Sequence, residues 1–78
     1  MTRYFFHLYN DVDVLDEEGL DLPDLGSARE TALVEARNMA AESVKDGHLT
    51  LSHYVAVTDE NGETLFRTSF QEAVRING

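Results

Sequence analysis

The chain has 78 residues, fifteen acidic against six basic residues for a net charge of −9, and no cysteine. The lack of cysteine excludes disulfides and cysteine-based zinc sites, and the shortage of lysine and arginine disfavours binding to nucleic-acid phosphates. This length predicts a single domain over residues 1–78. A lone core of this size supplies only about 3–5 kcal/mol, so good packing, a metal or oligomerisation has to add to it.

Residues 3–9 are predicted to form the first strand, because aromatic residues suit a pleated sheet. Both of its faces are largely apolar: one carries Tyr4, Phe6 and Leu8, and the other carries Phe5, His7 and Tyr9. A strand at a wet surface would alternate apolar with polar residues. This strand is therefore expected in the middle of a sheet, with both faces covered.

An acidic segment follows, Asp11–Asp24, with seven carboxylates in fourteen residues and no basic residue. Residues 12–15 favour a short second strand antiparallel to the first, and residues 20–22 favour a brief edge segment that ends at Pro23, which has no amide hydrogen to donate. The carboxylates could bind a cation, meet a basic partner, or stay in water and protect an exposed sheet edge. Calcium-loop spacing fails, because Leu15 stands at the fifth position and glycine comes only at the ninth.

We favour a solvated edge over a partner-binding one for this segment. The carboxylates that would face a basic partner are Asp11, Asp13, Asp16, Glu17 and Glu18. For a solvated edge, neutralising residues 16–18 together should leave the stability almost unchanged, because exposed like charges interact weakly.

A long helix is predicted over residues 27–46. Ser27 and Glu30 have the spacing of a capping box, and Gly47 is a natural left-handed stop. Mostly small residues recur at helical spacing: Ala28, Ala32, Leu33, Ala36, Met39, Ala40 and Val44. The helix should therefore lie close against the sheet.

Residues 54–58 and 64–68 are predicted to form a hairpin around Asn61-Gly62, a dipeptide typical of a type I′ turn with positive φ at both positions. Ser69 and Glu72 form a second capping-box pattern, which predicts a short helix over about residues 70–76. The predicted fold is thus α+β, a two-layer β-β-α-β-β arrangement with a mainly antiparallel sheet, one long helix on one face and a short C-terminal helix.

One helix covers only one face of such a sheet. Dimerisation through the other face would cover its aromatic residues and compensate for the small core. The residues assigned to this dimer face are Phe5, His7, Tyr9, Tyr54 and Phe66.

No motif for catalysis or cofactor binding is present: there is no nucleophile elbow, phosphate loop or dinucleotide fingerprint. His7, His48 and His53 are scattered, so structural roles are favoured, and His48 is expected near the carbonyls that end the helix. We expect no catalytic residue, no cofactor and no metal. The first residues read as neither a signal peptide nor a membrane span, which favours a cytoplasmic protein without membrane partners.

Several motifs together carry a family resemblance: residues 3–8 (RYFFHL), 16–19 (DEEG), 22–25 (LPDL), 27–29 (SAR) and 57–62 (VTDENG). With these motifs the chain resembles a family of small bacterial proteins, common in soil and plant-associated alphaproteobacteria and catalogued as a domain of unknown function. The resemblance extends over nearly the whole chain. It implies no activity, ligand or catalytic residue.

A looser likeness is to HicB-type antitoxins, which also have a small sheet backed by one helix. The acidic stretch followed by residues 28–33 is similar to their junction between loop and helix. Such antitoxins place three strands before the helix and usually add a DNA-binding segment. Here two strands and a brief edge segment are expected before the helix, and no DNA-binding segment is visible.

The sequence thus predicts a non-enzymatic, cytoplasmic, homodimeric interaction domain that does not bind nucleic acid. The alternative is an antitoxin-like or inhibitory module whose acidic edge binds a basic protein. A small basic protein encoded next to this one would favour the alternative.

Overall fold

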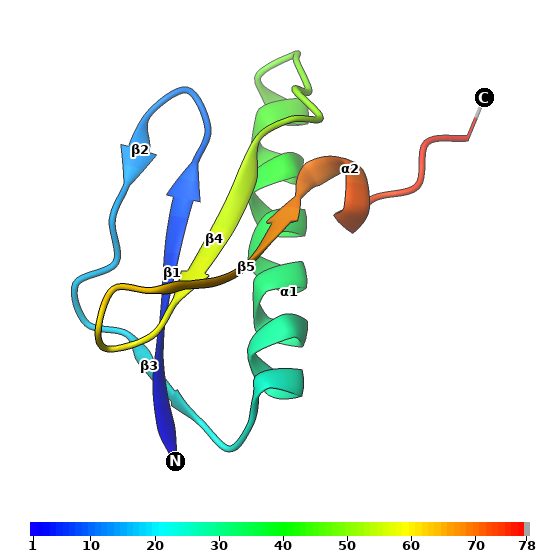
Figure 1. Cartoon of the computed structure of the whole chain (residues 1–78). Helices are drawn as coiled ribbons and strands as arrows, with labels where there is room; N and C mark the ends of the chain where they lie inside the picture. The colour runs from blue at the N-terminus through cyan, green and yellow to red at the C-terminus, as the bar shows by residue number, and fades with distance from the viewer. Residues whose placement is uncertain (78) are drawn as a thin grey trace.

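The computed structural model describes residues 1–77. Its elements in chain order are β1 (Thr2–Tyr9), β2 (Asp13–Val14), β3 (Leu20–Leu22), α1 (Leu25–Lys45), β4 (Tyr54–Thr58), β5 (Thr64–Ser69) and α2 (Phe70–Ala73). The long helix runs along one face of the sheet (Figure 1). The predicted α+β fold is confirmed, with β3 at the expected edge segment. No helix within residues 1–77 is long and apolar enough to cross a membrane.

The sheet is antiparallel throughout, in the order β2-β1-β4-β5, and β3 also pairs with β1. Leu8 of β1 lies opposite Val14 of β2, and Tyr4 of β1 lies opposite Leu20 of β3. These two short strands follow one another along the edge of β1 that faces away from β4. The partner strand on this edge is therefore split, and the middle of β1, residues 5–7, has no strand beside it there.

The start of α1 differs from the prediction. The helix begins at Leu25, and its cap is Asp24, whose carboxylate accepts a 2.8 Å hydrogen bond from the Ser27 amide. Hydrogen bonds from the Ser27 amide and hydroxyl hold the pKa of the Asp24 carboxyl below its ordinary value. The predicted cap at Ser27 is wrong because Asp24 satisfies that amide first, with a charged oxygen.

The end of α1 is as predicted. Gly47 has φ of +95°, and two hydrogen bonds close the last turn, from the Gly47 amide to the Val44 carbonyl (3.0 Å) and from the His48 amide to the Ser43 carbonyl (3.1 Å). This is the Schellman arrangement that a left-handed residue permits.

A row of alanines packs α1 onto the sheet. Ala28, Ala32 and Ala36 are completely buried and Ala40 is nearly so. They face a core built from both layers, made of Tyr4, Phe6, Val55, Val57, Phe70 and Ala73. Because alanine has no side chain beyond Cβ, the helix can approach the strands closely. The predicted stripe is confirmed except at its end, where Val44 is exposed.

The β4–β5 hairpin forms where predicted, but its turn is of another type. Gly62 has φ of +81°, and no other residue from 58 to 64 has a positive φ, so Asn61 does not adopt the left-handed form. The Asp59 carboxylate accepts hydrogen bonds from the Asn61 and Glu63 amides, at 2.9 and 3.0 Å. Asp59 thereby begins a longer loop, residues 59–63, with a left-handed glycine at position 62, in place of the two-residue turn.

The short helix α2 is capped as predicted, with the Ser69 hydroxyl accepting from the Glu72 amide at 3.2 Å. It ends at Ala73, earlier than the predicted residue 76. Phe70 is completely buried against the same core as α1, and Arg37 of α1 donates to the Ala73 carbonyl at 2.8 Å. Both helices therefore lie on one side of the sheet.

The close approach of α1 predicts that the alanine row does not tolerate larger residues. Ala36→Leu should lower the free energy of unfolding by about 1–3 kcal/mol, because the added carbons have no space between helix and sheet. Ala41→Leu, on the exposed side of the same helix, is the matched control and should change it by less than about 0.5 kcal/mol. Urea denaturation measures both, and equal effects would contradict the packing described here.

Candidate functional site

The face of the sheet opposite α1 carries most of the aromatic residues assigned to a dimer interface. We call it the open sheet face and define it by Phe5, His7, Tyr9, Tyr54 and Arg67. The Tyr9 and Tyr54 rings stack with centroids 5.0 Å apart, the Phe5 and His7 rings stack at 6.5 Å, and the Arg67 guanidinium lies 4.9 Å from the Tyr54 centroid. All four ring residues are only partly buried.

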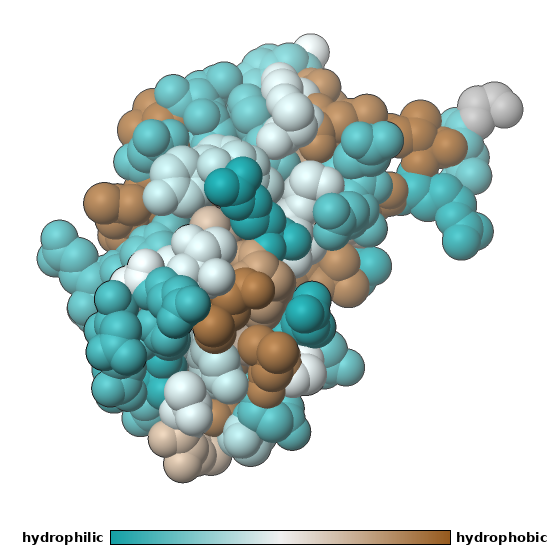
Figure 2. Space-filling model, in the orientation of Figure 1, coloured by the Kyte–Doolittle hydropathy of each residue, from teal (hydrophilic) through white to brown (hydrophobic). Residues whose placement is uncertain are grey.

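No helix in the described part of the chain packs on this open sheet face, since α1 and α2 share the core on the other side. The expectation that both faces of β1 are covered is therefore not met within one chain. The side of the molecule shown in Figure 2 mixes hydrophobic with hydrophilic residues.

Phe66 does not belong to this face. It lies opposite Val57, and cross-strand partners share a face, so its ring points toward α1. The Arg29 guanidinium of α1 lies 4.5 Å from the Phe66 ring centroid. Placing Phe66 in the dimer face was wrong, because the pairing of β5 with β4 sets Phe66 opposite Val57, which faces away from Tyr54.

Asp16 fills the gap between β2 and β3. Its Oδ2 accepts a 3.1 Å hydrogen bond from the Phe6 amide, and its Oδ1 accepts from the Glu18 and Gly19 amides, both at 3.1 Å. One carboxylate thus pairs an amide that the split strand leaves open and closes the turn leading into β3. The expectation that residues 16–18 form one solvated edge is wrong for Asp16, because it is half-buried and holds three amides.

Two opposing effects set the acidity of Asp16. Partial burial works to raise the pKa of its carboxyl. The hydrogen bonds from the Gly19, Phe6 and Glu18 amides, together with the charge interaction with His7, outweigh burial and hold the pKa below its ordinary value. The folded chain therefore stabilises the ionised form of the Asp16 side chain.

His7 is locked by the same segment. Its Nδ1 lies 3.0 Å from the Asp16 amide, which can only donate, so Nδ1 accepts. In the neutral ring Nε2 then carries the hydrogen and donates to Thr58 Oγ1, at 3.0 Å. A base that activates a hydroxyl needs Nε2 as an acceptor. This arrangement orients His7 as a structural residue and leaves it unsuited to activating the buried Thr58 hydroxyl.

The other predicted edge carboxylates divide into two groups. Asp11 lies between two histidines, with its oxygens 3.6 Å from His48 Nε2 and 3.8 Å from His53 Nε2. Asp13, Glu17 and Glu18 are exposed. His48 was expected beside the helix carbonyls, but its ring lies near Asp11, and only its backbone amide meets the helix end.

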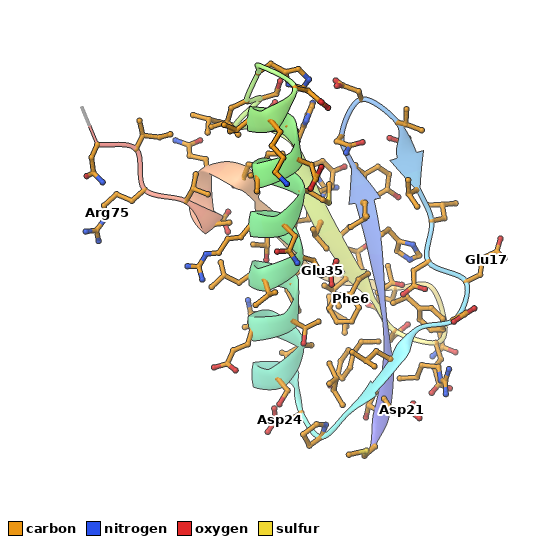
Figure 3. The ribbon with its side chains drawn as sticks, turned by 180° about the vertical axis from the view of Figure 1, so that it is seen from behind. Phe6, Glu17, Asp21, Asp24, Glu35 and Arg75 are labelled. Carbon is orange, nitrogen blue, oxygen red and sulfur yellow. The ribbon has the colours of Figure 1, made fainter. Side chains whose placement is uncertain are left out.

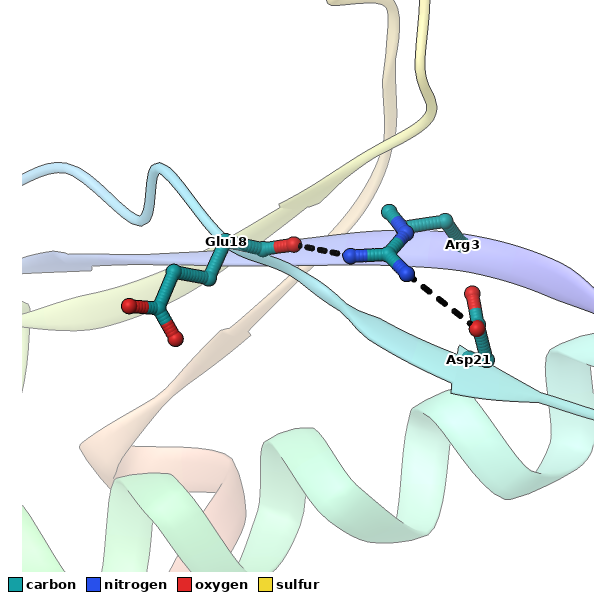
Figure 4. Close-up of polar contacts among 3 residues, drawn as sticks. All are labelled: Arg3, Glu18 and Asp21. Carbon is teal, nitrogen blue, oxygen red and sulfur yellow. Dashed lines mark hydrogen bonds and ion pairs between the residues drawn. The ribbon is translucent and has the colours of Figure 1, made fainter.

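Arg3 fastens β3 to β1 from the solvent side (Figure 4). Its guanidinium donates to the Glu18 carbonyl and to the Asp21 carboxylate, the latter at 3.2 Å. Gly19 lies close beside it, with φ of +73°; a Cβ there would stand 2.8 Å from Arg3 Cγ, 2.9 Å from Phe5 Cε2 and 3.0 Å from the Tyr4 carbonyl oxygen. The chain therefore needs glycine at this position for two reasons, backbone conformation and space.

Among residues 1–77, no group of three or more histidine, aspartate or glutamate side chains is arranged to hold a metal ion. Sequence reasoning missed both Asp16 and the Asp11 contacts. For Asp16 a local signal existed, since an aspartate followed three residues later by glycine is typical of a turn closed by its side chain. For Asp11 none did, because its partners lie more than thirty residues away in the sequence.

The family model described as a domain of unknown function (DUF6894) matches residues 3–71, from β1 into α2. The chain belongs to this family. No curated protein and no solved structure matches it. The resemblance to a domain of unknown function is thus confirmed, whereas the alphaproteobacterial origin and the likeness to HicB-type antitoxins stay predictions.

Gly19 and Gly62 offer a matched pair for testing the packing at β3. Both have positive φ, but a Cβ at Gly62 meets nothing within 4 Å. Gly62→Ala should therefore lower the free energy of unfolding by only the backbone term, about 1–2 kcal/mol. Gly19→Ala should cost about 1–3 kcal/mol more, because it also overpacks. Thermal or urea unfolding compares them, and equal losses would refute the close contact.

Asp16→Asn should lower the free energy of unfolding at neutral pH by about 1–3 kcal/mol, because the amide group turns a donor toward the Phe6 amide and loses the charge. Glu17→Gln, next to it and exposed, is the control and should change the value by less than about 0.5 kcal/mol. Chemical denaturation measures both. Equal, small effects would restore the solvated-edge interpretation for Asp16.

The same pair predicts a pH dependence. The folded-state pKa of Asp16 is depressed, so its stabilisation is fully present above the unfolded value of about 3.9 and is lost as pH falls below it. The stability difference between the native chain and Asp16→Asn should therefore be constant near neutral pH and shrink below about pH 4. A difference that is unchanged in acid would contradict this assignment.

Proposed function

We propose that this protein is a non-enzymatic interaction domain that self-associates through the open sheet face. The observation that carries the proposal is the asymmetry of the sheet: both helices pack on one side, and four ring residues remain partly exposed on the other. Aromatic residues and arginine are the types enriched in the buried centres of protein interfaces. A second copy offers the same surface, which is the geometry of a twofold dimer.

The side chains of this face support binding more than chemistry. The histidine on it is held by the Asp16 amide and Thr58, and the tyrosine rings are stacked on each other. Rings that are already oriented lose little freedom when a partner covers them. The small core of a 78-residue chain would also gain stability from association.

Sedimentation at micromolar concentration tests the proposal. The native chain should sediment at twice the 8.8 kDa mass of one chain. Tyr9→Lys should give the monomer, because it puts a charge in the interface, whereas Val34→Lys on the exposed side of α1 should leave the dimer intact. Circular dichroism shows that each variant is folded. A native chain that is monomeric at this concentration would overturn the proposal.

A further inference from the structure

A second surface lies on the helix side of the sheet, away from the open sheet face. It is a groove of about 520 Å³ between β1, the segment joining β2 to β3, and α1. Phe6 and Leu8 of β1 form part of its lining, and Thr31 and Glu35 line it from the helix. Figure 3 shows Phe6 and Glu35 in the space between β1 and α1.

The wall formed by the joining segment is apolar and exposed. Val14 is 50% exposed, Leu15 62% and Leu20 46%, although all three line the groove. These aliphatic side chains stand beside one another, unlike single apolar residues scattered over a surface. Contiguous exposed apolar residues with a polar rim are typical of an interaction site.

The polar groups of the groove are acidic. Its lining includes Glu17, Glu18 and Glu35 and no lysine or arginine. Asp16 also lines it, but its oxygens already accept three backbone amides. The three glutamates make no side-chain hydrogen bond or ion pair in the described part of the chain, and the whole chain carries a net charge of −9.

The chain itself does not fill this groove. The lining residues come from β1, the segment of residues 14–20 and α1, and the segment after α2 leads away from them (Figure 1). The surface is therefore available to another molecule. Its volume falls in the range of ligand sites, about 300–1,000 Å³, but its exposed wall suits side chains of a peptide better than an enclosed small molecule.

We propose that this groove binds an amphipathic, cationic segment of a partner protein. Aliphatic side chains of the partner lie against Leu8, Leu15 and Leu20, and its lysine or arginine side chains meet the glutamates at the rim. Electrostatic complementarity of this kind raises the association rate and selects the sign of the partner's charge. The proposal goes beyond self-association, because groove and open sheet face lie on opposite sides of the sheet.

The test uses the full chain and a synthetic amphipathic peptide of leucine and lysine, with a leucine–glutamate peptide of the same pattern as the opposite-charge probe. Nuclear magnetic resonance titration should move the amides of residues 14–20 and those near Thr31 and Glu35. The leucine–glutamate peptide should not bind. Shifts spread over the open sheet face instead, or equal binding of both peptides, would overturn the proposal.

Matched variants separate the groove from general attraction between opposite charges. Replacing Glu17, Glu18 and Glu35 together by Gln should weaken binding of the lysine peptide by about tenfold, since three ion pairs with the lysines of the peptide are removed. The control changes the same number of exposed glutamates elsewhere: Glu60, Glu63 and Glu72. It should weaken binding by less than about threefold. Equal losses in the two triple variants would reduce the effect to net charge and refute the site.

The apolar wall has its own pair of variants. Leu15→Asn should weaken binding of the lysine peptide, whereas Val12→Asn, equally exposed but outside the groove lining, should not. Tyr9→Lys, which should disrupt self-association, should retain peptide binding. The proposal of self-association and the proposal of peptide binding can therefore be refuted independently. Binding that is unaffected by Leu15→Asn would overturn the apolar part of the proposal.

Discussion

The contact between the Asp16 carboxylate and the Phe6 amide holds the edge of this sheet together. β2 and β3 each pair with only a few residues of β1. Between these two short strands, the Phe6 amide in the middle of β1 would lack a partner. An unpaired, half-buried amide is costly. The Asp16 carboxylate supplies the missing acceptor and closes the turn into β3 with its other oxygen. The backbone amide of Asp16 donates to His7 Nδ1 and so fixes the His7 ring.

The two faces of the sheet are covered in different ways. On one side the alanines of α1 permit close approach, so the packing of helix on sheet depends on small residues. On the other side no helix is available, and the rings of β1 and β4 cover one another by stacking. This chain buries one sheet face itself and leaves the other partly exposed. Both proposed binding surfaces lie where the fold leaves side chains uncovered.

The acidic segment illustrates how one run of like charges divides into separate roles. Asp16 is structural, Asp11 lies between two histidines, Asp21 pairs with Arg3, and Asp24 caps α1. The glutamates at positions 17 and 18 keep their carboxylates in water. The net charge of the chain therefore overstates how many carboxylates of this segment are free to attract a partner. Glu17 and Glu18 lie beside the exposed Leu15 and Leu20, in the lining of the same groove.

Local patterns in the sequence were enough to predict where the helices and strands form. Alternating aromatic residues predicted β1, the spacing of the alanines predicted α1 and its buried side, and Gly47 predicted where the helix ends, because each depends on residues within a few positions. The predicted start of α1 and the predicted hairpin turn were wrong because of competing local hydrogen bonds. The Asp24 carboxylate binds the Ser27 amide and caps the helix in place of Ser27. The Asp59 carboxylate binds the Asn61 and Glu63 amides in place of a two-residue turn at Asn61-Gly62. The pairing of strands decided which way Phe66 points, and the split partner of β1 decided that Asp16 binds backbone instead of water. These outcomes depend on residues brought together only by folding, so the candidate surfaces of this protein became visible only in its tertiary structure.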